Sequence, residues 1–135
     1  MISFRKLQID QIKDYLYHSC IHDSLLKDAR YNLVKGCLEL TLYSPYNCYF
    51  YKLSFQDILE MQFVKCFDYC YCDSETINTL IVDDNGMRFR NTEVSDSKII
   101  SDYIFFTLEM LSGDILNIVS KEISIEEHKG TVPLC

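Results

Sequence analysis

The sequence predicts an α+β fold in which one N-terminal helix packs on a curved, mainly antiparallel β-sheet, arranged as a sandwich or an open barrel. Three observations lead to this prediction. The chain has 10 Tyr and 8 Phe but only 4 Gly and 2 Pro, which favours strands over a loop-rich scaffold. Short segments of alternating polarity recur and are separated by turn residues. No strand–helix–strand alternation occurs, which argues against a Rossmann-like nucleotide-binding fold.

The chain length bounds the number of domains. With 135 residues, of which 48% are hydrophobic, the sequence fits a single domain over residues 1–135. A chain of this size buries roughly two-thirds of the surface that its unfolded form exposes, which is enough for a core without disulfides or metals.

The helix is predicted near the N-terminus, over about residues 10–19. Ile9, Ile12 and Leu16 recur at helical spacing, and polar residues occupy the opposite side of the helix. Asp10 is a suitable N-cap. The apolar stripe is narrow, as expected for a helix that lies on one face of a sheet.

Strands are predicted wherever polarity alternates between turn residues, as in Leu38, Leu40 and Leu42 with polar residues between them. Asn85-Gly86 lies between apolar residues and predicts a tight hairpin turn. Residues 126–135 are expected to be a loosely held tail. The predicted strands cover about residues 25–31, 37–43, 49–55, 58–64, 79–84, 87–91, 102–111 and 115–125.

Residues 54–67 leave two interpretations open. The run 54–57, Ser-Phe-Gln-Asp, resembles a capping box that opens a helix, whereas Leu59, Met61 and Phe63 alternate with polar residues as in a strand. We favour the strand, because the alternation is regular and the neighbouring segments are strands.

The strongest pattern in the chain is the strand–turn–strand signal over 103–125. We predict a three-residue loop at 112–114, because this register sets Leu108 opposite Ile118 and keeps apolar side chains together. The apolar phase changes after Ile118, which predicts a bulge or a strand end near Ser120.

Charge and cysteine content limit the classes of function and location. The net charge is −7 and no basic patch is visible, which argues against a nucleic-acid partner. An acidic surface serves solubility or a basic protein partner. The seven Cys form no disulfide framework, and the N-terminus lacks a signal peptide, so we expect reduced thiols in the cytoplasm. No apolar run approaches the length of a membrane span.

Two clusters invite a metal or thiol interpretation. Cys66, Cys70 and Cys72 place three soft ligands within seven residues, yet they lack the paired spacing of zinc sites, so buried packing is favoured. The segment 18–23 holds two His, one Cys and one Asp, but its spacing also fits a helix end followed by a turn. We therefore predict no metal, no cofactor and no catalytic residue.

The aromatic run Tyr43 to Tyr51 leaves two interpretations open. Tyr46 and Phe50 could face outward, where exposed aromatic side chains mark protein interfaces, but packing of the run into the core is favoured. Together with His22 and Asp23 they are the predicted partner-binding or pocket residues.

Part of the sequence resembles a diffuse set of small uncharacterised bacterial proteins, some of which neighbour polymorphic toxins as immunity proteins. The resemblance spans about residues 18–63 and, in outline, the hairpin 104–125, with His22, Asp23 and Phe55 as its distinctive matches. It lacks the aromatic anchor expected after the run that ends at Phe63. It implies a sheet-rich fold and a protein-binding role, and it assigns no catalytic residue. The runs that carry it are 21–28 (IHDSLLKD), 37–43 (CLELTLY) and 51–58 (YKLSFQDI).

These observations favour a non-catalytic, cytoplasmic binding protein that acts by protein–protein contact through an acidic and aromatic surface, with toxin neutralisation implied by the resemblance. Self-association is a further expectation. The alternative is a small-molecule-binding or hydrolytic domain with a pocket near His18, Cys20 and His22.

Overall fold

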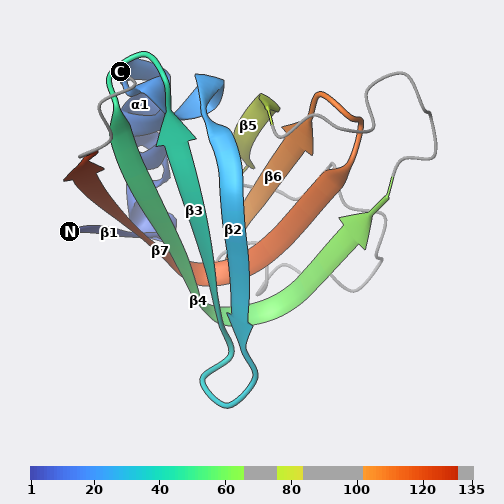
Figure 1. Cartoon of the computed structure of the whole chain (residues 1–135). Coiled ribbons are helices and arrows are strands. Elements are labelled where there is room, and N and C mark those ends of the chain that lie inside the picture. Colours follow the sequence, from blue (N-terminus) through green and yellow to red (C-terminus); the bar gives the residue numbers. More distant parts are fainter. Residues whose placement is uncertain (66–75, 84–101, 131–135) are drawn as a thin grey trace.

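The computed structural model describes residues 1–65, 76–83 and 102–130, except for the side chain of Cys20. One α-helix, two short 3₁₀ helices and seven strands make up this part of the chain (Figure 1). In chain order they are β1 (Ile2–Arg5), η1 (Lys6–Gln8), α1 (Ile9–His18), η2 (Cys20–Asp23), β2 (Leu25–Asn32), β3 (Cys37–Ser44), β4 (Tyr49–Val64), β5 (Ile77–Asp83), β6 (Ile104–Met110) and β7 (Ile115–Lys129).

All seven strands belong to one antiparallel sheet, with the order β2-β3-β4-β7-β6-β5 and with β1 paired to β7. The predicted helix and the antiparallel sheet are therefore confirmed. The two longest strands, β4 and β7, pair from Tyr49 with Lys129 to Val64 with Ile115 and run through the whole bent sheet (Figure 1). A single bridge between Leu25 and Thr76 joins β2 to the residue before β5.

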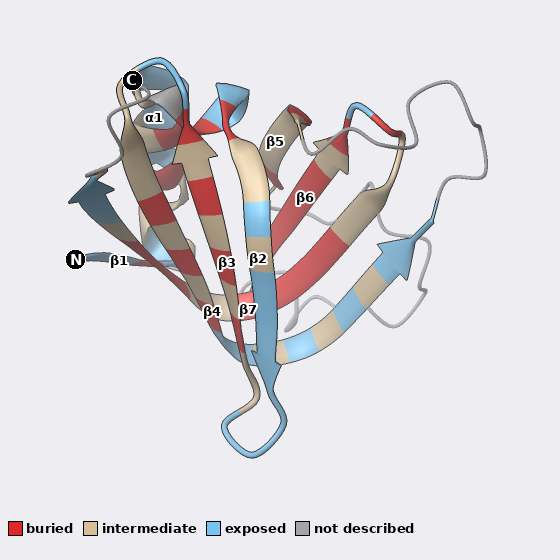
Figure 2. Ribbon diagram, in the orientation of Figure 1, coloured by how far each residue is buried: buried red, intermediate tan, exposed pale blue. Residues whose placement is uncertain are grey.

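The core lies between the bent sheet and α1. Ile12 and Leu16 of α1 are buried, as the helical spacing predicted, and α1 contacts β1 and β5. Along β3 the buried and half-buried residues alternate strictly (Figure 2). Alternation of this kind is typical of a sheet with one packed and one solvated face. The larger buried apolar side chains are Phe4, Ile21, Leu40, Leu42, Tyr51, Leu53, Phe55, Ile104, Phe106, Leu108, Ile118, Ile123 and Ile125.

Two predicted strands, 49–55 and 58–64, are one continuous strand, β4. The register to β7 shifts between Ile58 and Glu60, and Asp57 has a φ of 53°. Asp tolerates this left-handed conformation better than most residues. The polarity break that ended a strand in the sequence is therefore a β-bulge inside one strand, and residues 54–64 are not helical.

The phase change near Ser120 marks an exchange of neighbours along β7. β6 pairs with β7 as far as Ser120, and β1 pairs with it from Glu122 to Ile125. β4 stays on the other side throughout, and its bulge faces Ser120. Of the two alternatives predicted near Ser120, the strand end is wrong and the bulge lies opposite it, in β4. β7 continues to Lys129, so the predicted end at residue 125 is also wrong, and residues 126–129 are not a loose tail.

The predicted loop of the β6–β7 hairpin has the right length in the wrong place. The loop is 111–113, since Met110 N–H donates to Asp114 O at 2.9 Å, and Leu108 therefore faces Leu116. Gly113 has a φ of 90°, and three-residue hairpin loops place such a residue last. The predicted register is off by two residues, which leaves every side chain on its expected face.

Several differences from the prediction lie at element ends. β1 was not predicted, and β5 covers 77–83 rather than 79–84. β6 covers 104–110 rather than 102–111. The predicted strand 87–91, the Asn85-Gly86 turn and the Cys66, Cys70 and Cys72 cluster lie outside the described residues.

Candidate partner-binding surface

His22 and Asp23 lie in η2, which joins α1 to β2. The His22 Nε2 atom is 3.1 Å from the Asp23 carboxylate, and both side chains are about half exposed. The segment is anchored by buried Ile21 and Ser24. These two side chains therefore pair with each other at the surface.

His18, at the end of α1, and His22, in η2, do not share a hollow. His22 lines an open depression of about 620 Å³ between α1 and β5. His18 lines a different one, together with Tyr15 and Glu127, and pairs with Asp14 at 3.2 Å. A combined site that uses both imidazoles is therefore not formed.

An aromatic pair lies on the outer face of β3 and β4, which is the face turned away from α1 in Figure 1. Tyr43 and Phe50 are cross-strand partners, and their ring centroids are 4.9 Å apart. Both point away from the core, since Leu42 and Tyr51, their neighbours in sequence, are buried. Phe50 was named from the sequence as a possible outward-facing residue, whereas Tyr43 was named only as part of the aromatic run. The pairing of Tyr43 with Phe50 is the signal that would have identified it.

Tyr46 stands in the turn that joins β3 to β4, between Tyr43 and Phe50, and 74% of its surface is exposed. We call Tyr43, Tyr46 and Phe50 the aromatic patch. Aromatic side chains with a polar end are enriched in the centres of protein interfaces. The exposure of Tyr46 agrees with the outward-facing interpretation of the aromatic run.

The turn that carries Tyr46 is held by hydrogen bonds from three directions. Cys48 N–H donates to Ser44 O at 2.9 Å, and the Asn47 side-chain amide donates to the hydroxyl of buried Tyr51 at 2.9 Å. Gly130 N–H donates to Cys48 O at 2.6 Å. A Cβ at position 130 would lie 2.4 Å from that oxygen, so the approach requires glycine. The turn therefore presents Tyr46 from a rigid base.

Charged side chains surround the aromatic patch on the same face. Lys52 follows Phe50 along this side of β4; it is paired with Glu126 in register and lies 3.8 Å from Glu39. His128 is the register partner of Phe50 and lies 4.0 Å from Glu126. Sequence reasoning missed His128, because the strand that carries it extends beyond the predicted end. An aromatic centre with a charged rim is the usual anatomy of an interface.

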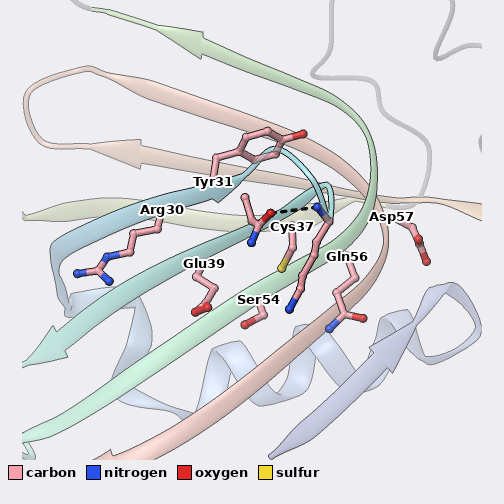
Figure 3. A pocket seen from close by; sticks show the side chains of 9 residues that line it. Arg30, Tyr31, Cys37, Glu39, Ser54, Gln56 and Asp57 are labelled. Carbon is pink, nitrogen blue, oxygen red and sulfur yellow. Dashed lines mark hydrogen bonds between the residues drawn. The ribbon is translucent and has the colours of Figure 1, made fainter.

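A polar hollow of about 740 Å³ lies at the other end of this face, near the β4 bulge (Figure 3). Glu39, Ser54 and Gln56 point to the same side, with Cys37 among them. Burial, and then the nearby carboxylate of Glu39, raises the pKa of the Cys37 thiol. A raised pKa keeps the thiol protonated near neutral pH, so Cys37 is poorly suited to nucleophilic attack.

Three further observations bear on the sequence predictions. Cys48 is disulfide-bonded, so the expectation of reduced thiols is wrong for this residue. Among the described residues, no three His, Cys, Asp or Glu side chains come together in a way suited to a metal ion. None of the helices described has the length and hydropathy that crossing a bilayer requires.

No protein-family model matches the chain, and no curated protein matches it.

Proposed function

We propose that the protein is a non-catalytic binding protein that recognises another protein through the aromatic patch and its charged rim. The observation that carries the proposal is the exposed Tyr46, held on a hydrogen-bonded turn beside the Tyr43–Phe50 ring pair. A rigid, exposed aromatic side chain loses little conformational entropy on binding, which is why Tyr is frequent among the residues that dominate binding energy.

The partner we propose is a basic protein. The chain carries a net charge of −7, and opposite charge accelerates association and favours correct orientation. Glu126, which lies beside His128 at the edge of the aromatic patch, supplies local negative charge. Toxin neutralisation of the immunity type is the specific role that we propose, on the resemblance of residues 18–63 to such proteins.

The test is site-specific photo-crosslinking in the native cell. A photoreactive phenylalanine replaces Tyr46, and the matched control carries it at Leu33, which is 85% exposed in the β2–β3 turn. We expect one basic protein to be crosslinked at position 46 and not at position 33. The same products from both positions, or none from position 46, would overturn the proposal.

The captured partner is then purified and its affinity measured. Tyr46→Ala should weaken binding about tenfold or more, as for aromatic residues at interface centres, and added salt should weaken binding further. If the partner is harmless when expressed alone, toxin neutralisation is wrong while the binding function stands.

A further inference from the structure

The second half of β4 has a described strand on one side only. β3 pairs with β4 as far as Phe55, whereas β7 pairs with it to Val64. Figure 1 shows this half of β4 leaving β3 and β2 and continuing beside β7. We call residues 58–64 the β4 arm.

Apolar side chains are exposed along the β4 arm to a degree unusual for a strand. The exposed fractions are 47% for Leu59, 40% for Met61, 65% for Phe63 and 50% for Val64. Figure 2 shows the contrast with the first half of the same strand, where buried residues recur. A long apolar edge strand is a template for pairing with another chain, and proteins normally protect such edges with charge, proline or a cover.

Met61 and Phe63 also line an apolar hollow of about 290 Å³. Its other wall comes from β2 and β3, through Leu26, Ala29 and Leu38. The side of the β4 arm that faces this hollow is therefore apolar. A strand that paired with the edge of the arm would meet this apolar surface.

We propose that the β4 arm pairs in antiparallel fashion with the β4 arm of a second copy of this chain, about a two-fold axis at Met61. In this register Met61 faces the partner's Met61, and Leu59 faces the partner's Phe63. Directly opposed side chains stabilise a sheet when both are apolar. The same patch serves both copies, as a two-fold interface requires.

Glu60 is the charged residue of the β4 arm, and it distinguishes the proposed register from one shifted along the arm. In the proposed register Glu60 faces the partner's Gln62. Within one chain the Gln62 side-chain amide already donates to the Glu60 carboxylate at 3.1 Å, so the pair is chemically matched across the axis. An axis at Glu60 would oppose two carboxylates, which destabilises a sheet.

The net charge of −7 gives the dimer a distinctive salt dependence. Two copies repel each other at long range, and salt screens this repulsion. Dimerisation should therefore strengthen as ionic strength rises, whereas binding of a basic partner should weaken. The dimer does not rest on the proposed function, and the opposite salt responses separate the two.

The test is analytical ultracentrifugation of the whole chain over a concentration series. The wild type should reach twice the 15.9 kDa chain mass, whereas Met61→Lys and Met61→Glu should each be monomeric, since like charges meet at the axis. An equimolar mixture of the two variants should form a heterodimer, because Lys then faces Glu. The control Leu33→Lys, in the β2–β3 turn, should dimerise like the wild type.

Circular dichroism of each variant checks the fold, and the mixed sample distinguishes repulsion at the axis from damage to the arm, because only repulsion is relieved by the opposite charge. A wild type that stays monomeric at its highest soluble concentration would overturn the proposal. So would a dimeric Met61→Lys variant, or two folded variants that fail to associate when mixed.

Discussion

At the scale of single residues, Tyr15 links the helix to the end of the longest strand pair. Its hydroxyl donates to the carboxylate of Glu127, and its ring lies 6.1 Å from that of Phe4. Burial, and then the hydrogen bond to Glu127, raises the pKa of Tyr15 above its ordinary value. The neutral phenol is therefore the form that the folded chain favours.

The raised pKa predicts a loss of stability at high pH. Below about pH 10 both folded and unfolded chains hold the Tyr15 proton, so the contribution is complete. Above that pH the unfolded chain releases the proton while the folded chain keeps it, and the free energy of unfolding falls. Urea unfolding of wild type and Tyr15→Phe should show a difference in stability that shrinks from about pH 10 upward. A difference that stays constant with pH would contradict this.

At the scale of elements, the bulge in β4 separates the half that pairs with both β3 and β7 from the more exposed half that pairs with β7. Asp57 occupies the left-handed region there, with a φ of 53°, and the pairing with β3 ends two residues earlier. A bulge bends the strand that carries it. The bend directs residues 58–64 away from β3 and so creates the β4 arm.

The conformation of Asp57 predicts how substitutions act at the bulge. Asp57→Val should lower the free energy of unfolding by about 1–2 kcal/mol, because a β-branched residue is strained at positive φ. Asp57→Gly should cost little, since glycine adopts this conformation freely. The measurement is urea unfolding of both variants. Equal stability of the two would show that backbone strain does not govern this position.

The same elements show what the sequence could and could not predict. Alternation found β3 and the helix, because side-chain period follows secondary structure directly. It could not place the loop of the β6–β7 hairpin, since a shift of two residues keeps Leu108 opposite an apolar residue. The loop position is fixed by the positive φ of its last residue, which Gly113 adopts. It could not join the halves of β4, because a bulge and a strand end break the pattern alike.

The candidate surface could be predicted only in part, because some of its residues come from distant segments of the chain. Tyr46 and Phe50 could be named from an aromatic run near a turn. Their neighbour His128 comes from a strand more than 70 residues away, and only the register of β4 and β7 brings it beside Phe50. His18 and His22 are close in sequence, yet they line different hollows.

At the scale of the whole molecule, one core holds both halves of the sheet together. The rings of Phe55 in β4 and Phe106 in β6 are 4.8 Å apart, although β7 lies between their strands. Both rings are almost fully buried. Because β4 and β7 run through both halves, we expect neither half to keep its packing without the other.

The Phe55 contact predicts a large and global loss of stability on truncation. Phe55→Ala should lower the free energy of unfolding by about 3–5 kcal/mol through the cavity that it leaves. Near- and far-ultraviolet circular dichroism should still report one shared transition. The matched control is Phe63→Ala on the same strand, which should cost under about 0.5 kcal/mol when measured below the concentration of dimerisation. Separate transitions for the two signals would contradict a shared core.

The position of β7 also sets the order of events during synthesis. β7 is the last strand described, yet β4, β6 and β1 all pair with it. A nascent chain can form only the local ladders β2–β3–β4 and β5–β6 before β7 leaves the ribosome, and each then shows an unpaired edge. Pairings between distant segments form late and leave such edges open to aggregation. Completion of the fold should therefore follow translation of residue 129, and chaperones that shield strand edges should raise the yield.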